Sequence, residues 1–146
     1  MFKHILLATD GSAASDQATR IAISLARTHG ARLTALSVVD PYPYLGIGQA
    51  NPMGFQAYMS AAHVHAGKAL SRAAELCDDG GPPIRIETRI VEETTTSHGI
   101  AQTARDEGAD LIVIGSHGHG ALRKLVLGSV TTKVLAEATV PVLVVR

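Results

Sequence analysis

The stretch GSHGHGALRKLVLGS, residues 115–129, has the residue types of an anion-binding loop. It follows directly on the apolar run LIVI and lacks side chains at Gly115 and Gly118, and again at Gly128, just before Ser129. Glycines let successive backbone N–H groups approach a ligand closely, and such groups form a nest for anions. The second cluster opens a helical pattern, and a helix N-terminus offers free N–H donors with a partial positive charge. We therefore predict that the two glycine clusters bind two phosphates of one phosphate-containing ligand.

Two simpler interpretations of the same residues stay open. Glycine is common in strand-to-helix loops, and Ser129 can serve as an N-cap without any ligand.

Other phosphate-binding motifs are absent from the sequence, because no G-x-x-x-x-G-K-[ST] occurs and the first strand turn reads ATDGSAAS instead of G-x-G-x-x-G. The sequence therefore argues against a P-loop and against a nicotinamide dinucleotide site.

The elements that must position this loop alternate along the chain. Unbroken apolar runs predict buried parallel strands, and periodic apolar stripes predict helices between them. The first expected strand lies within 4–11 and runs into a turn there, and the other expected strands are 32–40, 84–92, 109–115 and 140–145. The expected helices are 13–29, about 55–77, 97–107 and about 130–137, with a surface loop over 41–54. This alternation favours an α/β fold with a parallel sheet and helices on both faces.

The first helix has the clearest boundary signals. Ser12 is a suitable N-cap, and Gly30 is a suitable C-terminal stop. The residues expected to face the core follow helical spacing, and they are Ala14, Ala18, Ile21, Ala22 and Leu25.

Composition limits the classes of partner. Thirteen basic residues balance thirteen acidic ones, so no electrostatic signal points to nucleic acid or to a membrane surface. The chain has one cysteine, Cys77, and no apolar run of secretory or membrane-spanning length, so we expect a cytoplasmic protein. His63 and His65 are two residues apart on a predicted helix and point to different sides, so we do not expect them to share a metal ion.

The glycine pattern, read as G-x2-G-x9-G-[ST], together with ILLATDGS near the start and VPVLVVR at the end, resembles the universal stress protein family. The resemblance spans the whole chain and implies one domain, residues 1–146, with a three-layer α/β/α fold. It also implies an open five-stranded parallel sheet of order 3-2-1-4-5. In that family the glycine pattern marks the subgroup that binds ATP.

The resemblance implies a set of nucleotide-binding residues. Backbone groups would face the adenine at Ala8, Thr9 and Val39. The ribose and first phosphates would be wrapped by Gly115, Ser116, His117 and Gly118, and the outer phosphates would be held by Gly128, Ser129 and Val130. Asp10 would lie near the ribose or the phosphates and is the candidate ligand for Mg²⁺; the alternative is that it forms the turn and caps the following helix.

These implied features favour an ATP-binding stress-response or signalling module whose occupancy changes its conformation or its choice of an unidentified protein partner. One alternative is a slow Mg²⁺-dependent ATPase, in which Arg123 or Lys124 folds over the phosphates; both side chains can equally be solvated. Another is an interaction protein with an empty cleft. Because the last strand is apolar on both faces and would lie at a sheet edge, we also expect a homodimer through Val140 to Val145.

Overall fold

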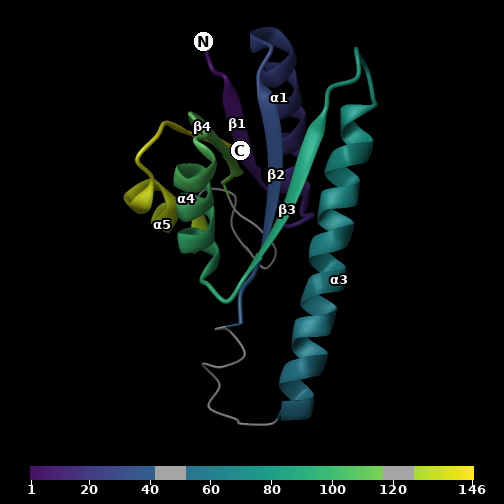
Figure 1. Cartoon of the computed structure of the whole chain (residues 1–146), viewed down its shortest axis with the longest axis vertical. Helices are drawn as coiled ribbons and strands as arrows, with labels where there is room; N and C mark the ends of the chain where they lie inside the picture. The colour runs from purple at the N-terminus through teal and green to yellow at the C-terminus, as the bar shows by residue number, and fades with distance from the viewer. Residues whose placement is uncertain (42–51, 117–126) are drawn as a thin grey trace.

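Five strands form one parallel sheet in the computed structural model, which describes residues 1–41, 52–116 and 127–146 (Figure 1). The strands are β1 (His4–Ala8), β2 (Arg32–Val39), β3 (Ile86–Glu92), β4 (Leu111–Gly115) and β5 (Val142–Val145). Their order in the sheet is β3-β2-β1-β4-β5, which confirms the predicted order. The central strand β1 therefore lies between β2 and β4, and it is buried along its whole length.

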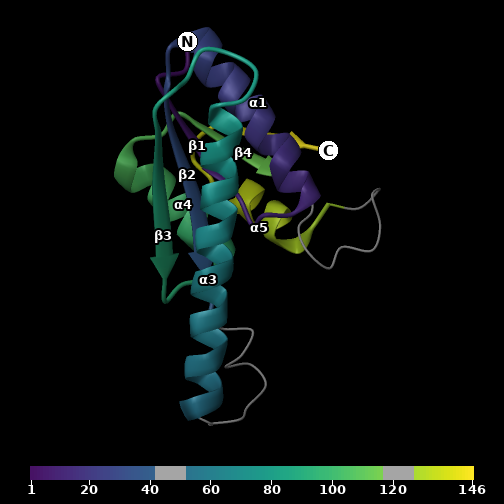
Figure 2. The ribbon, with the colours of Figure 1, turned by 90° about the vertical axis from the view of Figure 1, so that its right-hand side faces the viewer.

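The helices cover both faces of the sheet (Figure 2). They are α1 (Ala13–His29), α3 (Pro52–Cys77), α4 (Thr96–Glu107) and α5 (Ser129–Glu137). Alternate residues of β1 lie in two separate hydrophobic cores, one on each face of the sheet. Ile5 and Leu7 pack with the apolar residues of α1 and α3, while Leu6 and Ala8 pack with those of α4 and α5. This two-sided burial is the reason that β1 has no polar alternation in the sequence.

The predicted core face of α1 was wrong at one position. Ile21 is 38% exposed, whereas Ser15, Thr19 and Ile23 join the buried face. The buried residues are spaced i, i+3, i+4, i+7, i+8 and i+11, which is one face of a helix that includes small polar side chains, and these are Ser15, Ala18, Thr19, Ala22, Ile23 and Ala26. The predicted cap at Ser12 and stop at Gly30 are both confirmed.

Helix α3 begins at Pro52, so residues 52–54 belong to the helix and not to the predicted loop. Proline suits the first helical position because its fixed φ is already helical and its missing N–H would have no partner there. The first half of the helix extends beyond the sheet at the carboxyl ends of the strands (Figure 1). Over the residues that the structure describes, no helix has both the length and the apolarity to cross a bilayer.

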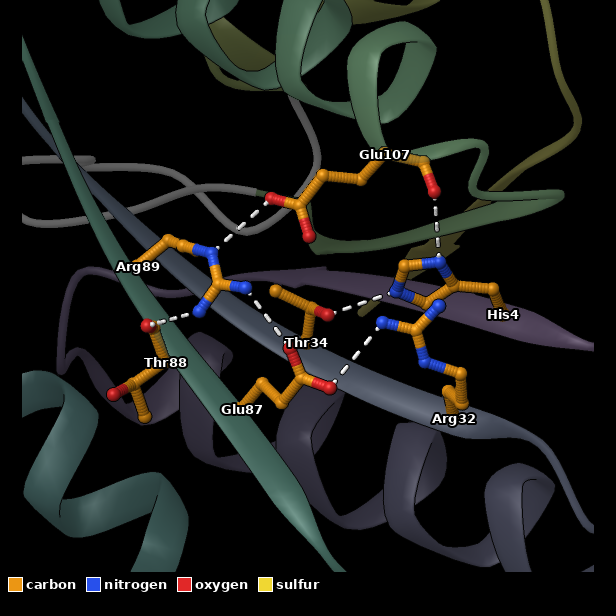
Figure 3. Close-up of polar contacts among 7 residues, drawn as sticks. All are labelled: His4, Arg32, Thr34, Glu87, Thr88, Arg89 and Glu107. Carbon is orange, nitrogen blue, oxygen red and sulfur yellow. Dashed lines mark hydrogen bonds and ion pairs between the residues drawn. The ribbon is translucent and has the colours of Figure 1, made fainter.

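The two edge strands of the sheet differ in their charged side chains. The β3 edge carries a network in which Glu87 accepts hydrogen bonds from Arg32 and Arg89, and Arg89 also pairs with Glu107 of α4 (Figure 3). These hydrogen bonds from the two guanidinium groups lower the pKa of Glu87, so its carboxylate stays charged. The β5 edge has no such charges, and its Leu143 is 37% exposed. Pairing of β5 with a second copy of the chain stays a prediction.

Candidate functional site

The carboxyl ends of β1 and β4 meet at the point where the strand order reverses. These strands are neighbours in the sheet, with Leu7 beside Val113. The chain leaves β1 toward α1 and leaves β4 toward α5, which lie on opposite faces (Figure 2). In open parallel sheets, ligands bind outside the strand ends at such a switch point, and we call this region of the protein the crevice.

The structure brings together most of the residues predicted from the sequence. Three groups meet at this edge: Ala8, Thr9 and Asp10 at the end of β1, Gly115 and Ser116 at the end of β4, and Gly128, Ser129 and Val130 at the start of α5. The predicted contacts of His117 and Gly118, and the clamp by Arg123 or Lys124, lie outside the described residues.

Helix α5 is fixed against the end of β4 by two short hydrogen bonds. Gly128 N–H donates to the Ser116 carbonyl at 2.7 Å, and the Thr131 hydroxyl donates to the Gly115 carbonyl at 2.8 Å. Thr131 is buried, so its hydroxyl contact is shielded from water. The start of α5 therefore has a defined position at the crevice.

The first turn of α5 has no side-chain cap. The N-cap is Gly128, and Ser129 lies one position inside the helix, so the alternative in which Ser129 caps it is wrong. The first helical backbone bond runs from Thr132 N–H to Gly128, and the N–H groups of residues 129–131 find no acceptor among the described residues. An uncapped first turn presents orphan donors and a partial positive charge, which suits an anion.

Gly115 has a packing role that the sequence did not reveal. A Cβ atom placed there would lie 3.1 Å from the carbonyl carbon and Cβ of Ala14 and 3.2 Å from its oxygen. Its φ is outside the left-handed region, so the position needs glycine for space alone. The missing side chain lets Ala14, in the first turn of α1, approach the end of β4 closely.

Asp10 organises the turn between β1 and α1. Its Oδ1 accepts a hydrogen bond from Ser12 N–H at 2.9 Å and another from the Ser15 hydroxyl at 2.6 Å. Its own N–H donates to Ser15 Oγ at 3.1 Å. The turn-forming and capping alternative for Asp10 is therefore present in the structure, and a role as a Mg²⁺ ligand stays a prediction.

Strand β2 continues past the end of β1, and this exposes one backbone edge to the crevice. Beyond β1, the N–H of Thr9 donates a hydrogen bond to the Leu36 carbonyl at 3.0 Å. The backbone groups of Leu36 therefore face β1, and the N–H of Thr9 is not available to a ligand. In a parallel strand the residues alternate between the two neighbours. The N–H and carbonyl of Val38 thus face the crevice, and those of Val39 face β3, beside Glu92. Sequence analysis missed Val38, since this alternation depends on the register.

Asp40, directly after β2, was also missed. Helix α4 has Thr95 as its N-cap, but the side chain of Thr95 makes no capping bond. Asp40 supplies the acceptor from a distant part of the chain. Its Oδ2 accepts a hydrogen bond from Thr96 N–H at 3.1 Å and another from the Thr96 hydroxyl at 3.3 Å. The carboxylate also suits the positive end of the α4 dipole. Asp40 thereby ties the end of β2 to the start of α4.

Replacing Asp40 with alanine is expected to lower the free energy of unfolding by about 1–2 kcal/mol, because the first turn of α4 loses its only side-chain acceptor among the described residues. For a domain of this size that corresponds to a fall in Tm of roughly 2–8 °C. Asp40→Asn keeps an acceptor oxygen and serves as the matched control in thermal unfolding. Equal Tm values for wild type and Asp40→Ala would contradict this capping role.

The two histidines of α3 do point to different partners. His63 Nε2 lies 3.1 Å from Glu92 Oε1, and His65 Nε2 lies 2.9 Å from the Asp10 carbonyl oxygen. Across the described ranges, no group of three or more His, Cys, Asp or Glu side chains is close enough to hold a metal ion.

Comparisons with known proteins give one consistent result. The model of the universal stress protein family matches residues 1–146. A Thermus aquaticus protein, named as a universal stress protein in the 3′ region of a QAH/OAS sulfhydrylase gene, is 40% identical, with all of both chains covered. The universal stress protein UspA from Lactobacillus plantarum superposes with a TM-score of 0.82 at 28% identity, over 99% of this chain and 97% of that one. A universal stress protein from Archaeoglobus fulgidus, solved in complex with dAMP, has a TM-score of 0.71 at 21% identity, over 99% and 98%.

Proposed function

This chain belongs to the universal stress protein family, and we propose that it is a module that binds ATP in the crevice between β1 and β4. Occupancy of the crevice would change the conformation of the protein or its choice of partner in a stress response. The observation that carries the proposal is the uncapped first turn of α5, held at the end of β4 by Gly128 and Thr131.

The anionic end of the nucleotide fits the start of α5. The N–H groups of residues 129–131 lack acceptors among the described residues, and the helix dipole adds to their attraction for phosphate. The hydroxyl of Ser129 is exposed at the same turn and is suited to donate to a phosphate oxygen. Gly128 leaves room for a phosphate to approach the backbone, because a side chain there would occupy the N-cap position.

The adenine end fits the exposed edge of β2. The N–H and carbonyl of Val38 provide one donor and one acceptor on the same side of the strand. Adenine offers the complementary pair on its Watson–Crick edge, where N1 accepts and the exocyclic N6 donates. Guanine presents the opposite order at the corresponding positions, so this edge would favour adenine nucleotides. The dAMP complex of the Archaeoglobus fulgidus relative is consistent with this class of ligand.

Binding is better supported than hydrolysis. The two hydrogen bonds that Oδ1 of Asp10 accepts in the α1 turn give this carboxylate a structural role that requires no catalysis. If Mg²⁺ accompanies ATP, the oxygens of Asp10 and Ser129 would hold it, and the ion would neutralise phosphate charge there. The Asp10 turn would then position both the protein backbone and the metal.

Calorimetry on the purified chain, with and without Mg²⁺, tests the proposal. We expect saturable binding of ATP at one site per chain, weaker binding of GTP, and no sustained release of ADP. AMP and cAMP, compared in the same titrations, report how much of the affinity comes from the outer phosphates. ADP release that falls to background in Asp10→Ala would instead support the ATPase. Absence of binding by every adenine nucleotide would leave the proposal without support.

A further inference from the structure

Helix α3 directs two hydrogen-bond donors at the backbone just after β1 and β2. The Tyr58 hydroxyl donates to the Asp40 carbonyl at 2.9 Å, and His65 Nε2 contacts the Asp10 carbonyl at the same distance. The two side chains are seven residues apart, so they lie on one face of the helix two turns from each other. One helix face therefore holds the backbone after both β1 and β2.

The His65 contact has a defined chemistry. A carbonyl oxygen can only accept a hydrogen bond, so Nε2 of His65 must carry a proton and donate it, whichever protonation state the ring adopts. His63, two residues earlier, faces a different part of the molecule and pairs with Glu92. The contact with Asp10 is thus specific to the position of His65.

His65 completes the hydrogen bonding of the Asp10 peptide. The N–H and carboxylate of Asp10 are held by Ser12 and Ser15 at the start of α1, and the carbonyl of Asp10 is held by His65 from α3. Because these contacts come from two different helices, they fix both the position and the orientation of the turn. A turn that lost the contact from α3 would keep its cap but could rotate relative to the crevice.

We propose that His65 is a positioning residue of the nucleotide site: by holding the Asp10 carbonyl it sets the orientation in which the turn after β1 meets the nucleotide. This inference rests on the proposed ATP-binding function. Tyr58 performs the equivalent task after β2, next to the backbone edge of Val38. Through these two contacts, α3 belongs to the binding site although neither side chain needs to touch the nucleotide.

The state of Tyr58 supports the second contact. Partial burial raises the pKa of the Tyr58 phenol, and the negative charge of Asp40 raises it further. The hydroxyl therefore keeps its proton at neutral pH and remains a donor to the Asp40 carbonyl. Tyr58→Phe removes only this donor and preserves the ring, so it is a conservative second variant.

ATP titrations of four variants test the roles of His65 and Tyr58. His65→Ala is expected to weaken ATP binding by about threefold to tenfold, the range for loss of one hydrogen bond. His65→Gln places an amide nitrogen at nearly the same reach from the backbone and is expected to restore most of the affinity. His63→Ala, the matched control on another face of α3, is expected to bind as wild type does. Tyr58→Phe is expected to weaken binding to a similar degree as His65→Ala.

The outcomes separate this inference from the proposed function. If the wild-type chain binds no adenine nucleotide, the proposed function fails. If wild type binds ATP and His65→Ala binds it equally well, the positioning role fails while the function stands. A loss that His65→Gln does not restore, or that His63→Ala reproduces, also overturns the role of the hydrogen bond, because general destabilisation of α3 would then explain it.

Discussion

Gly128→Asp is expected to lower ATP affinity by roughly 100-fold or more while leaving the fold intact, since a carboxylate about 4 Å from a phosphate is repelled by several kcal/mol at an intermediate dielectric. Because the aspartate would occupy the N-cap of α5, its carboxylate would also accept hydrogen bonds from the N–H groups that are proposed to bind the phosphate. Aspartate is a better N-cap than glycine by a few tenths of a kcal/mol, so the Tm should stay level or rise slightly. Calorimetry with ATP and thermal unfolding measure the two effects separately.

Gly128→Asn is the matched control for charge. Its side chain has nearly the same shape and caps equally well, but it is neutral, so it should weaken ATP binding less than Gly128→Asp does. The backbone at Gly128 has φ −63° and ψ 155°, which any residue can adopt, so neither variant strains the chain. A folded Gly128→Asp variant with wild-type ATP affinity would remove the start of α5 from the site.

Gly115→Val is expected to destabilise the protein by about 3 kcal/mol, near the upper end for overpacking a close contact. The added Cβ alone would lie 3.1–3.2 Å from backbone atoms of Ala14, and two further methyl groups would force α1 away from β4. That loss is a large share of the roughly 5–15 kcal/mol that stabilises a typical domain. Urea unfolding measures it directly, with an unchanged m-value expected if the denatured state is unaffected.

Gly67→Ala provides the opposite control. Gly67 lies within α3, its φ is not left-handed, and a Cβ there would meet nothing within 4 Å. Alanine at a helical position without steric conflict should therefore stabilise the protein by about 1 kcal/mol. Wild-type stability of Gly115→Val in the same unfolding experiment would show that α1 does not depend on the missing side chain at that position.

Local signals in the sequence were sufficient for most of the fold. Unbroken apolar runs predicted the buried strands, because a strand covered on both faces needs no polar alternation. Ser12 and Gly30 predicted the ends of α1, because a side-chain cap and a left-handed C-cap depend on residues adjacent to the helix; Gly30 has φ +63°. Gly115 and the pair Gly128-Ser129 predicted where β4 ends and where α5 begins, since each signal is adjacent to the boundary that it marks.

Tertiary structure alone decided which groups meet at the crevice. The choice of Val38 over Val39 follows from the register of β2 against β1, which no local pattern encodes. Two hydrogen bonds join residues more than fifty positions apart in the sequence: Asp40 accepts one from the first turn of α4, and His65 donates one to the Asp10 carbonyl. The sequence by itself therefore determined the elements and the glycine pattern from which phosphate binding is predicted, whereas the packing of α1, α3 and α4 against the sheet determined the geometry of the candidate site. The physical reason is that caps and periodicity act within a few residues, while hydrogen bonds between elements exist only after the sheet has brought them together.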